Sequence, residues 1–206
     1  PTADGPVIQR SSARAIKNGA SLAHVLEMAR AVCDHYEIPI IIFSYYNPIM
    51  AYGCENFYRD ARIAGADGVL VVDLPLEESS ELTDVFTYDD FSMIHLVAPT
   101  TPSKRMAEIA SAASGFLYLV SKTGVTGSDG LDTSEIQGQM ERLRAVTDLP
   151  VCVGFGISTA DDVAAVAPMA DGVVIGSAFE RMIEENIKRS DLPDLIGLQT
   201  AAYKAA

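Results

Sequence analysis

Two short apolar runs near the end of the chain constrain its fold more than any other feature. The first covers residues 151–154 and leads into Phe155 and Gly156, and the second covers residues 172–175 and leads into Gly176 and Ser177. Apolar side chains and glycine fill these runs without alternation, which is typical of strands buried on both faces of a parallel sheet. A helical pattern follows each run, over residues 159–169 and 178–188. Each unit is therefore predicted to be a strand that turns through glycine into a helix.

The same alternation extends along the whole chain. Strands are expected near residues 40, 70, 94, 118, 152 and 174, and helices over residues 6–18, 22–32, 55–64, 79–86, 103–113, 134–147 and 192–203. Such repeats predict an α/β fold of the (β/α)₈ barrel type. Six of the eight strand–helix units are counted, and the 206 residues fall below the roughly 250 typical of this fold. We therefore expect one barrel domain over residues 1–206 that is incomplete at its N-terminal end.

The composition excludes several classes of function. A net charge of −13 argues against nucleic acid or an anionic membrane surface as a partner. The three cysteines are widely spaced and form no CxxC pattern, so we expect no metal site and a location in the reducing cytoplasm. The sequence has neither the pattern of a signal peptide nor an apolar run long enough to span a bilayer.

The glycine-ended strands indicate an anion site. Gly156, Gly176 and Ser177 would place free backbone amides at helix starts, where the helix dipole also favours a phosphate. The loops after the last two strands of a barrel often bind phosphate in this way. The alternative is that glycine merely permits tight turns, but two consecutive turns of this kind favour phosphate binding. The loop 121–127, which ends in Thr126 and Gly127, could also lend amides to a phosphate or remain a surface loop.

Four other polar residues could contribute to a site. Asp4, in a turn before a helix, could accept a substrate N–H, although the local sequence favours a helix N-cap. Tyr45 and Asn47 follow the first strand, at the end where barrel sites are built, unless they form a surface turn closed by Pro48. Tyr118 lies within the fourth strand and suits either the core or a site.

Seven stretches, in order along the chain, together resemble the tryptophan synthase α subunit family. They are Asp-Gly-Pro-Val-Ile-Gln at 4–9, Tyr-Tyr-Asn-Pro at 45–48, Asp-Leu-Pro-Leu-Glu-Glu at 73–78, Tyr-Leu-Val-Ser at 118–121, Thr-Gly-Val-Thr-Gly at 123–127, Gly-Phe-Gly-Ile-Ser at 154–158 and Gly-Ser-Ala at 176–178. Each motif alone is weak, but the ordered set is specific. The resemblance implies a cytoplasmic TIM-barrel lyase of tryptophan biosynthesis. It would cleave indole-3-glycerol phosphate to indole and glyceraldehyde 3-phosphate by a retro-aldol reaction.

The resemblance also implies roles for individual residues. Asp4 would bind the indole N–H, which replaces the expectation of an N-cap. Tyr118, Thr126 and Phe155 would contact the rest of the substrate. The phosphate would be held by Gly127, Gly156, Gly176 and Ser177, and the β subunit of an α₂β₂ complex would contact Asn47 and Pro75. The resemblance implies no cofactor in this subunit, with pyridoxal phosphate in the β subunit.

One family feature has no counterpart in the sequence. The principal acid/base glutamate of the family lies on a strand before the position that matches Pro1, so this chain alone is expected to be inactive. A piece that binds phosphate or the β subunit without catalysis is therefore one alternative. Another phosphate-binding barrel, such as an isomerase, is a second alternative, although the Asp-Gly-Pro and Thr-Gly-Val-Thr-Gly stretches argue against it.

Overall fold

Six parallel strands form one sheet, in which strands consecutive in sequence are neighbours in space. The computed structural model describes residues 4–87, 90–121 and 132–206. The strands are β1 (Ile41–Ser44), β2 (Gly68–Val71), β3 (Ser92–Val97), β4 (Leu117–Val120), β5 (Val151–Gly154) and β6 (Gly172–Val174). Among the described residues β1 and β6 do not pair with each other, so the strands form an arc rather than a closed ring.

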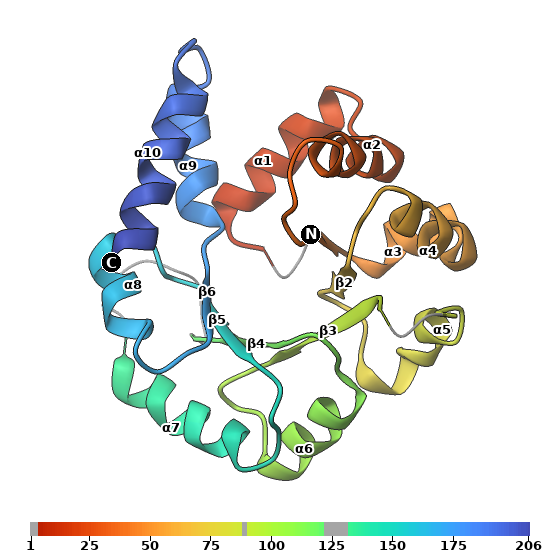
Figure 1. The fold of residues 1–206 in the computed structure, drawn as a ribbon, viewed down its shortest axis with the longest axis vertical. Coiled ribbons are helices and arrows are strands. Elements are labelled where there is room, and N and C mark those ends of the chain that lie inside the picture. The colour runs from red at the N-terminus through yellow and green to blue at the C-terminus, as the bar shows by residue number, and fades with distance from the viewer. Residues whose placement is uncertain (1–3, 88–89, 122–131) are drawn as a thin grey trace.

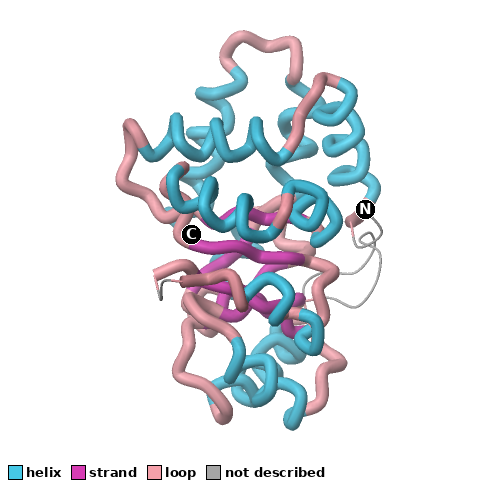
Figure 2. Tube along the Cα trace, turned by 90° about the vertical axis from the view of Figure 1, so that its right-hand side faces the viewer, coloured by secondary structure: helices cyan, strands magenta, loops and turns pink. Residues whose placement is uncertain are grey.

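Helices surround the outside of this arc (Figure 1). They are α1 (Pro6–Lys17), α2 (Leu22–Cys33), α3 (Tyr46–Tyr52), α4 (Cys54–Ile63), α5 (Ser80–Thr83), α6 (Ser103–Ala112), α7 (Thr133–Arg144), α8 (Ala160–Val166), α9 (Ser177–Asn186) and α10 (Leu192–Ala205), with a 3₁₀ turn η1 (Leu76–Glu78). Seen from the side, the strands run between helices above and below them (Figure 2). Helix α1 packs against α9, and Arg10 and Arg14 of α1 both form ion pairs with Glu184 of α9.

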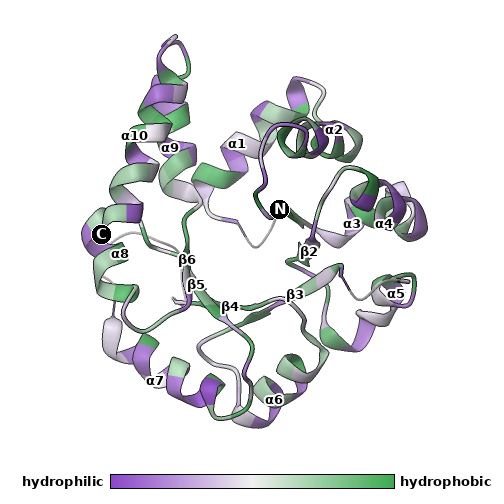
Figure 3. Ribbon diagram, viewed as in Figure 1, coloured by the Kyte–Doolittle hydropathy of each residue, from purple (hydrophilic) through white to green (hydrophobic). Residues whose placement is uncertain are grey.

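The sheet buries side chains on both faces, as expected for parallel strands. Its outer face packs against the helices in two clusters, one around Phe57 and Leu82 and the other around Met106 and Leu143. Its inner face carries a smaller cluster of Leu70, Ile94 and Tyr118. Hydrophobic residues dominate the strands, and hydrophilic residues gather on the outward sides of helices such as α7 (Figure 3). The inner face therefore leaves an apolar space within the arc.

The six predicted strands are confirmed, one helix was not predicted and one predicted helix is shorter than expected. Helix α3 was not predicted, and a turn after the first strand was an open alternative, because its seven residues are too few for a clear helical period and Pro48 falls inside it. Proline is tolerated there because the third position of a helix donates no intrahelical hydrogen bond. The helix expected over residues 79–86 is shorter, since α5 covers only Ser80–Thr83 and the 3₁₀ turn η1 precedes it.

Candidate functional site

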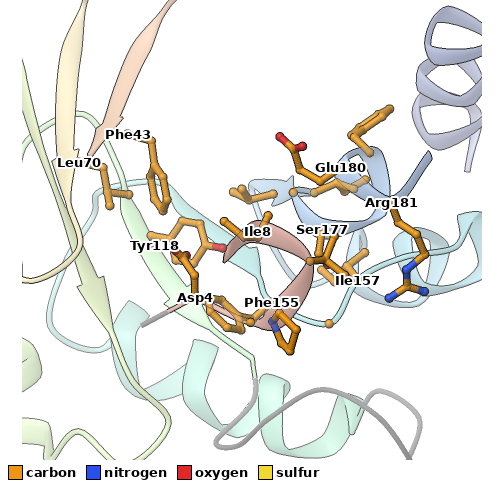
Figure 4. A pocket seen from close by; sticks show the side chains of 18 of the residues that line it. Asp4, Ile8, Phe43, Leu70, Tyr118, Phe155, Ile157, Ser177, Glu180 and Arg181 are labelled. Atoms are coloured by element: carbon orange, nitrogen blue, oxygen red, sulfur yellow. The ribbon is translucent and has the colours of Figure 1, made fainter. Parts of the chain in front are cut away.

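A cavity of about 830 Å³ opens at the carboxyl ends of the strands and reaches the inner face of the arc. Segments far apart in the sequence form its walls: the start of α1, the inner faces of β1, β2 and β4, and the segments that follow β5 and β6. Figure 4 shows the main side chains around it. Its lining is mostly apolar and includes Ile8, Ile41, Phe43, Leu70, Phe116, Tyr118, Phe155, Ile157, Val174 and Ile175. A space of this kind suits an organic ring system better than a fully polar ligand.

Asp4 supplies a carboxylate to this apolar space. The N-cap of α1 is Gly5, which makes no side-chain cap, so the local interpretation of Asp4 as the N-cap is wrong. The Asp4 carboxylate instead accepts a hydrogen bond from the Tyr45 hydroxyl at 2.8 Å, across 41 residues of sequence. Its backbone carbonyl accepts from the Gln9 side-chain amide at 2.7 Å. Both the carboxylate and the backbone carbonyl of Asp4 are therefore hydrogen-bonded to other side chains.

Tyr118 projects from β4 into the same cavity. It packs directly over Gly154 of β5, where an added Cβ would lie only 2.1 Å from the Tyr118 hydroxyl oxygen. Glycine at this position therefore makes the room that the phenol ring occupies. Burial raises the pKa of Tyr118 to about 12, because the charged phenolate is poorly solvated there. The hydroxyl keeps its proton at neutral pH and makes no hydrogen bond within the described residues, which leaves it available to a ligand.

Phe155 lines the cavity from a strained turn. Its φ of 82° lies in the left-handed region, which costs a residue other than glycine of order 1–3 kcal/mol. Two hydrogen bonds from Ser121 hold the turn, because the Ser121 amide donates to the Gly154 carbonyl at 2.9 Å and its hydroxyl donates to the Phe155 carbonyl. The turn after β5 is thus fixed by the segment after β4.

The start of α9 offers free backbone amides to the cavity. Gly176 is its N-cap and provides no side-chain cap, and Gly176, Ser177 and Phe179 all line the cavity. Within the described residues, the amides of Ser177, Ala178 and Phe179 have no acceptor. A helix start in this state is an anion-binding arrangement.

The start of α8 differs from that of α9, because side chains cap part of it. Thr159 and Asp162 form a capping box there, in which the Asp162 amide donates to the Thr159 hydroxyl at 3.0 Å. The Asp162 carboxylate accepts in turn from the amides of Ser158 and Thr159, both at 2.9 Å. Gly156 precedes this box, in a turn with φ 80°, and still lines the cavity.

The remaining predicted residues lie elsewhere. Thr126 and Gly127 fall outside the described residues. Asn47 is exposed on α3, and Pro75 is exposed at the start of η1. The segments that carry them are linked, because the Tyr46 amide donates to the Asp73 carboxylate at 2.7 Å. They follow β1 and β2, so both lie on the side of the molecule where the cavity opens.

Sequence reasoning missed several lining residues. Phe43 and Leu70 sit on inward-facing positions that could have been found by following the period-2 alternation from strand to strand. Glu180 and Arg181 line the cavity from the first turns of α9, and no motif marked them. The Glu180 carboxylate accepts a hydrogen bond from the Ser11 hydroxyl of α1, whereas the Arg181 side chain extends away from Tyr118 (Figure 4). The pairing of Tyr45 with Asp4 was also missed.

Residues 4–87, 90–121 and 132–206 contain no group of three or more His, Cys, Asp or Glu side chains placed to hold a metal ion. Over the same ranges, every helix is too short or too polar to cross a membrane.

Comparison with known proteins decides the family. The family model described as tryptophan synthase alpha chain matches residues 1–200. This chain belongs to that family. A tryptophan synthase alpha chain from Desulfosudis oleivorans is 62% identical over 206 residues, covering 100% of this chain and 78% of that protein. One from Desulfatibacillum aliphaticivorans is 61% identical over the same 206 residues and also has 78% of its length covered.

Solved structures agree with this assignment and establish the fold as a TIM barrel. The tryptophan synthase subunit alpha of Legionella pneumophila has a TM-score of 0.88 and 36% identity, with 100% of this chain and 76% of that chain covered. A chain from the tryptophan synthase α₂β₂ complex of Pyrococcus furiosus has a TM-score of 0.89 and 34% identity, with 100% and 83% covered. The chain thus has the α-subunit function in tryptophan biosynthesis, as a lyase that cleaves indole-3-glycerol phosphate. The alternative of an isomerase is set aside.

Proposed function

We propose that the cavity holds indole-3-glycerol phosphate with its indole ring beside Asp4 and its phosphate at the start of α9. The shape and polarity of the cavity support this orientation. Its volume of about 830 Å³ lies in the range usual for sites that enclose an organic ligand. Apolar side chains such as Phe43, Leu70 and Phe155 offer contacts to a ring. The free amides of α9 offer the complementary contacts to an anion.

The single observation that carries the proposal is the anchored carboxylate of Asp4 in a mostly apolar cavity. Cleavage requires a proton to reach the ring carbon that bears the glycerol chain. That protonation places positive charge on the ring nitrogen, so its N–H becomes a stronger donor. The Asp4 carboxylate accepts this N–H and stabilises the charged state more than the neutral ring. The carbon–carbon bond then breaks as the glycerol hydroxyl loses its proton, and its electrons return to the ring.

Tyr118 contacts the glycerol part in this arrangement. Its hydroxyl retains its proton at neutral pH, so it donates a hydrogen bond to a glycerol oxygen rather than acting as a base. The reaction needs at least two proton transfers, and Asp4 acts here as an acceptor of the ring N–H and not as the base for both. These proton transfers need no cofactor or metal for their chemistry.

The phosphate is held by Gly156, Gly176 and Ser177, with Thr126 and Gly127 as further contacts of the substrate. Amides at a helix start suit a dianion in a chain of net charge −13, because they supply local positive potential without charged side chains. Arg181 is the one cationic residue among the described residues that line the cavity.

The exposed residues Asn47 and Pro75 contact a tryptophan synthase β subunit in this proposal. One structurally similar protein, from Pyrococcus furiosus, is described as part of an α₂β₂ complex. A partner docked on α3 and η1 would cover the side of the molecule where the cavity opens, so indole could pass to it directly. The chain would work in the cytoplasm.

Substitution of Asp4 tests the proposal. In the full chain with its β subunit, Asp4→Asn keeps the size of the side chain but removes its charge. We expect indole formation to fall by about 10²–10³-fold, the range for removing an electrostatic contact to a developing charge. Thermal stability should stay close to the parent, because Asp4 caps no helix. Retained indole formation would rule out this role for Asp4.

A further inference from the structure

The hydroxyl of Tyr45 contacts the carboxylate of Asp4. Asp4 lines the cavity, but Tyr45 does not. It donates to Oδ2 of Asp4 at 2.8 Å, and Tyr45 is absent from the residues that form the cavity wall. Tyr45 therefore reaches the substrate only through Asp4. From this geometry we propose that Tyr45 is a positioning residue, which orients the Asp4 carboxylate so that its other oxygen accepts the ring N–H. This inference rests on the role proposed above for Asp4.

The backbone around Tyr45 is well suited to positioning. Tyr45 follows directly on β1 and is the N-cap of α3, so a strand and a helix fix it from either side. Its carbonyl accepts from the Ser44 hydroxyl at 3.0 Å, and the next amide, that of Tyr46, donates to Asp73 at 2.7 Å. A phenol has only two rotatable side-chain bonds, so a fixed backbone leaves its hydroxyl in a narrow range of positions.

Asp4 needs such support because its own segment constrains it weakly. It lies two residues before the first residue of α1, outside the helix. Gln9 holds its backbone carbonyl but not its carboxylate. An ionised carboxylate has about four lone-pair positions on its two oxygens and only accepts hydrogen bonds. One donor fixed at Oδ2 therefore sets the rotation of the group and leaves Oδ1 free for the ring N–H.

The chain contains a matched control for this contact. The Tyr52 hydroxyl donates to Oδ2 of Asp60 at 2.8 Å, so a tyrosine–aspartate hydrogen bond of the same length occurs at the other end of α3, although Asp60 is also paired with Arg59. Neither Tyr52 nor Asp60 lines the cavity. Tyr45→Phe and Tyr52→Phe each remove one phenolic hydroxyl and keep the aromatic ring, so general effects of the substitution should be alike.

A pair of ligands separates positioning from a general structural role. The first is indole with a three-carbon alkyl phosphate chain on ring carbon 3, which cannot be cleaved. The second is its benzothiophene counterpart, in which sulfur replaces the N–H, so it has no donor for Asp4. Calorimetric titration of both ligands into the full chain measures how much of the affinity depends on the N–H.

We expect Tyr45→Phe to lower the affinity for the indole ligand by about 3- to 10-fold. The affinity for the benzothiophene ligand should stay within about twofold of the parent. The upper limit of this effect is the complete loss of a hydrogen bond to a charged group, which would weaken binding by roughly 10- to 100-fold. The double variant Asp4→Asn, Tyr45→Phe should bind the indole ligand no more weakly than Asp4→Asn alone, because the two residues act as one unit. Tyr52→Phe should change neither affinity.

Three outcomes would overturn the inference. If Tyr45→Phe lowered the affinity for both ligands equally, the contact between Tyr45 and Asp4 would be merely structural. Unchanged binding of the indole ligand, as in Tyr52→Phe, would show that Asp4 needs no positioning. If Asp4→Asn itself leaves the indole affinity unchanged, the proposed role of Asp4 fails, and the positioning role fails with it. The Asp4→Asn measurement thus distinguishes failure of the proposed function from failure of this inference alone.

Discussion

At the scale of single residues, the site depends on a few polar atoms whose surroundings are apolar. Tyr118 occupies its position because Gly154 has no side chain, and Asp4 is held by a hydroxyl from another loop. His95 shows the opposite case, a buried polar group outside the site. It is only 6% exposed on β3, and its Nε2 atom has no hydrogen-bond partner among residues 4–87, 90–121 and 132–206. An unpaired buried imidazole costs stability, and the cost grows if the ring becomes charged.

This burial of His95 makes the stability of the fold depend on pH. Burial lowers the pKa of His95 below its ordinary value near 6.5, so the folded chain binds fewer protons than the unfolded chain as the pH falls. The stability that neutral His95 permits is therefore present above about pH 6.5 and is lost as the pH drops toward the folded-state pKa. We expect the free energy of unfolding to fall between pH 7 and 5, and His95→Leu to reduce that slope by up to about 1.4 kcal/mol per pH unit. Urea titrations at several pH values measure the free energy of unfolding and its dependence on pH.

The comparison variant is His35→Leu, which changes an exposed imidazole just beyond the end of α2. It removes the same chemical group without emptying a buried site. A pH slope that fell equally in both variants, or that His95→Leu left unchanged, would contradict the role assigned to burial of His95.

At the scale of elements, the two helices that follow β5 and β6 have different starts and different roles. Helix α8 begins with a capping box, in which the Thr159 hydroxyl accepts from the Asp162 amide, whereas α9 starts at Gly176 with no side-chain cap. The free start belongs to the helix that lines the cavity, and the capped start lies beyond the turn that carries Phe155. The capping box also holds the Ser158 amide, so it fixes the segment that links that turn to α8.

Removal of the cap should therefore destabilise the fold locally. Thr159→Ala deletes the hydroxyl that accepts from the Asp162 amide, and such losses cost about 0.5–2 kcal/mol. Chemical denaturation should show a loss of this size, and hydrogen exchange should become faster first in α8. Thr200→Ala is the control, because that exposed hydroxyl bonds back to Ile196 within α10 and caps no helix. A loss as large in the control, or none in Thr159→Ala, would refute the assignment.

At the scale of the whole molecule, the sequence was sufficient for the order of elements but not for their contacts. Six apolar runs predicted six parallel strands, because burial on both faces leaves a continuous hydrophobic signal. Helix α3 was missed because it has seven residues, too few for a clear helical period. The capping box of α8 was readable as threonine with an acid three residues later, yet the glycine signal led to an expectation of free amides.

Contacts between distant residues were beyond sequence reasoning for a physical reason. Asp4 and Tyr45 lie 41 residues apart, and only the packing of α1 and β1 around one cavity brings them together. Local propensity at Asp4 favoured a cap, which a neighbouring glycine fills instead. The motifs that resembled the family compensated for this, since they pointed to Asp4 without giving the contact that holds it.

The surface around the cavity opening leads to the last expectation, which concerns the partner. Asn47 and Pro75 are exposed on adjacent segments, and Asp73 joins those segments through the Tyr46 amide. A surface that is exposed yet internally fixed can bind a partner with little loss of conformational entropy. We expect Asn47→Ala in the full chain to weaken association with the β subunit by about 5- to 10-fold or more, the effect of losing a contact worth over 1 kcal/mol. Sedimentation velocity or surface plasmon resonance with purified β subunit measures it.

Asn18→Ala is the matched control for this measurement. Asn18 is also an exposed asparagine, but it follows the end of α1, about 15 Å along the helix from Ile8 in the cavity wall. The thermal stability of Asn47→Ala should stay near the parent, because its exposed side chain packs against no core. Equal affinity of the two variants for the β subunit would place the interface elsewhere. Weaker association of Asn47→Ala alone would instead locate the partner on the side of the molecule where the cavity opens.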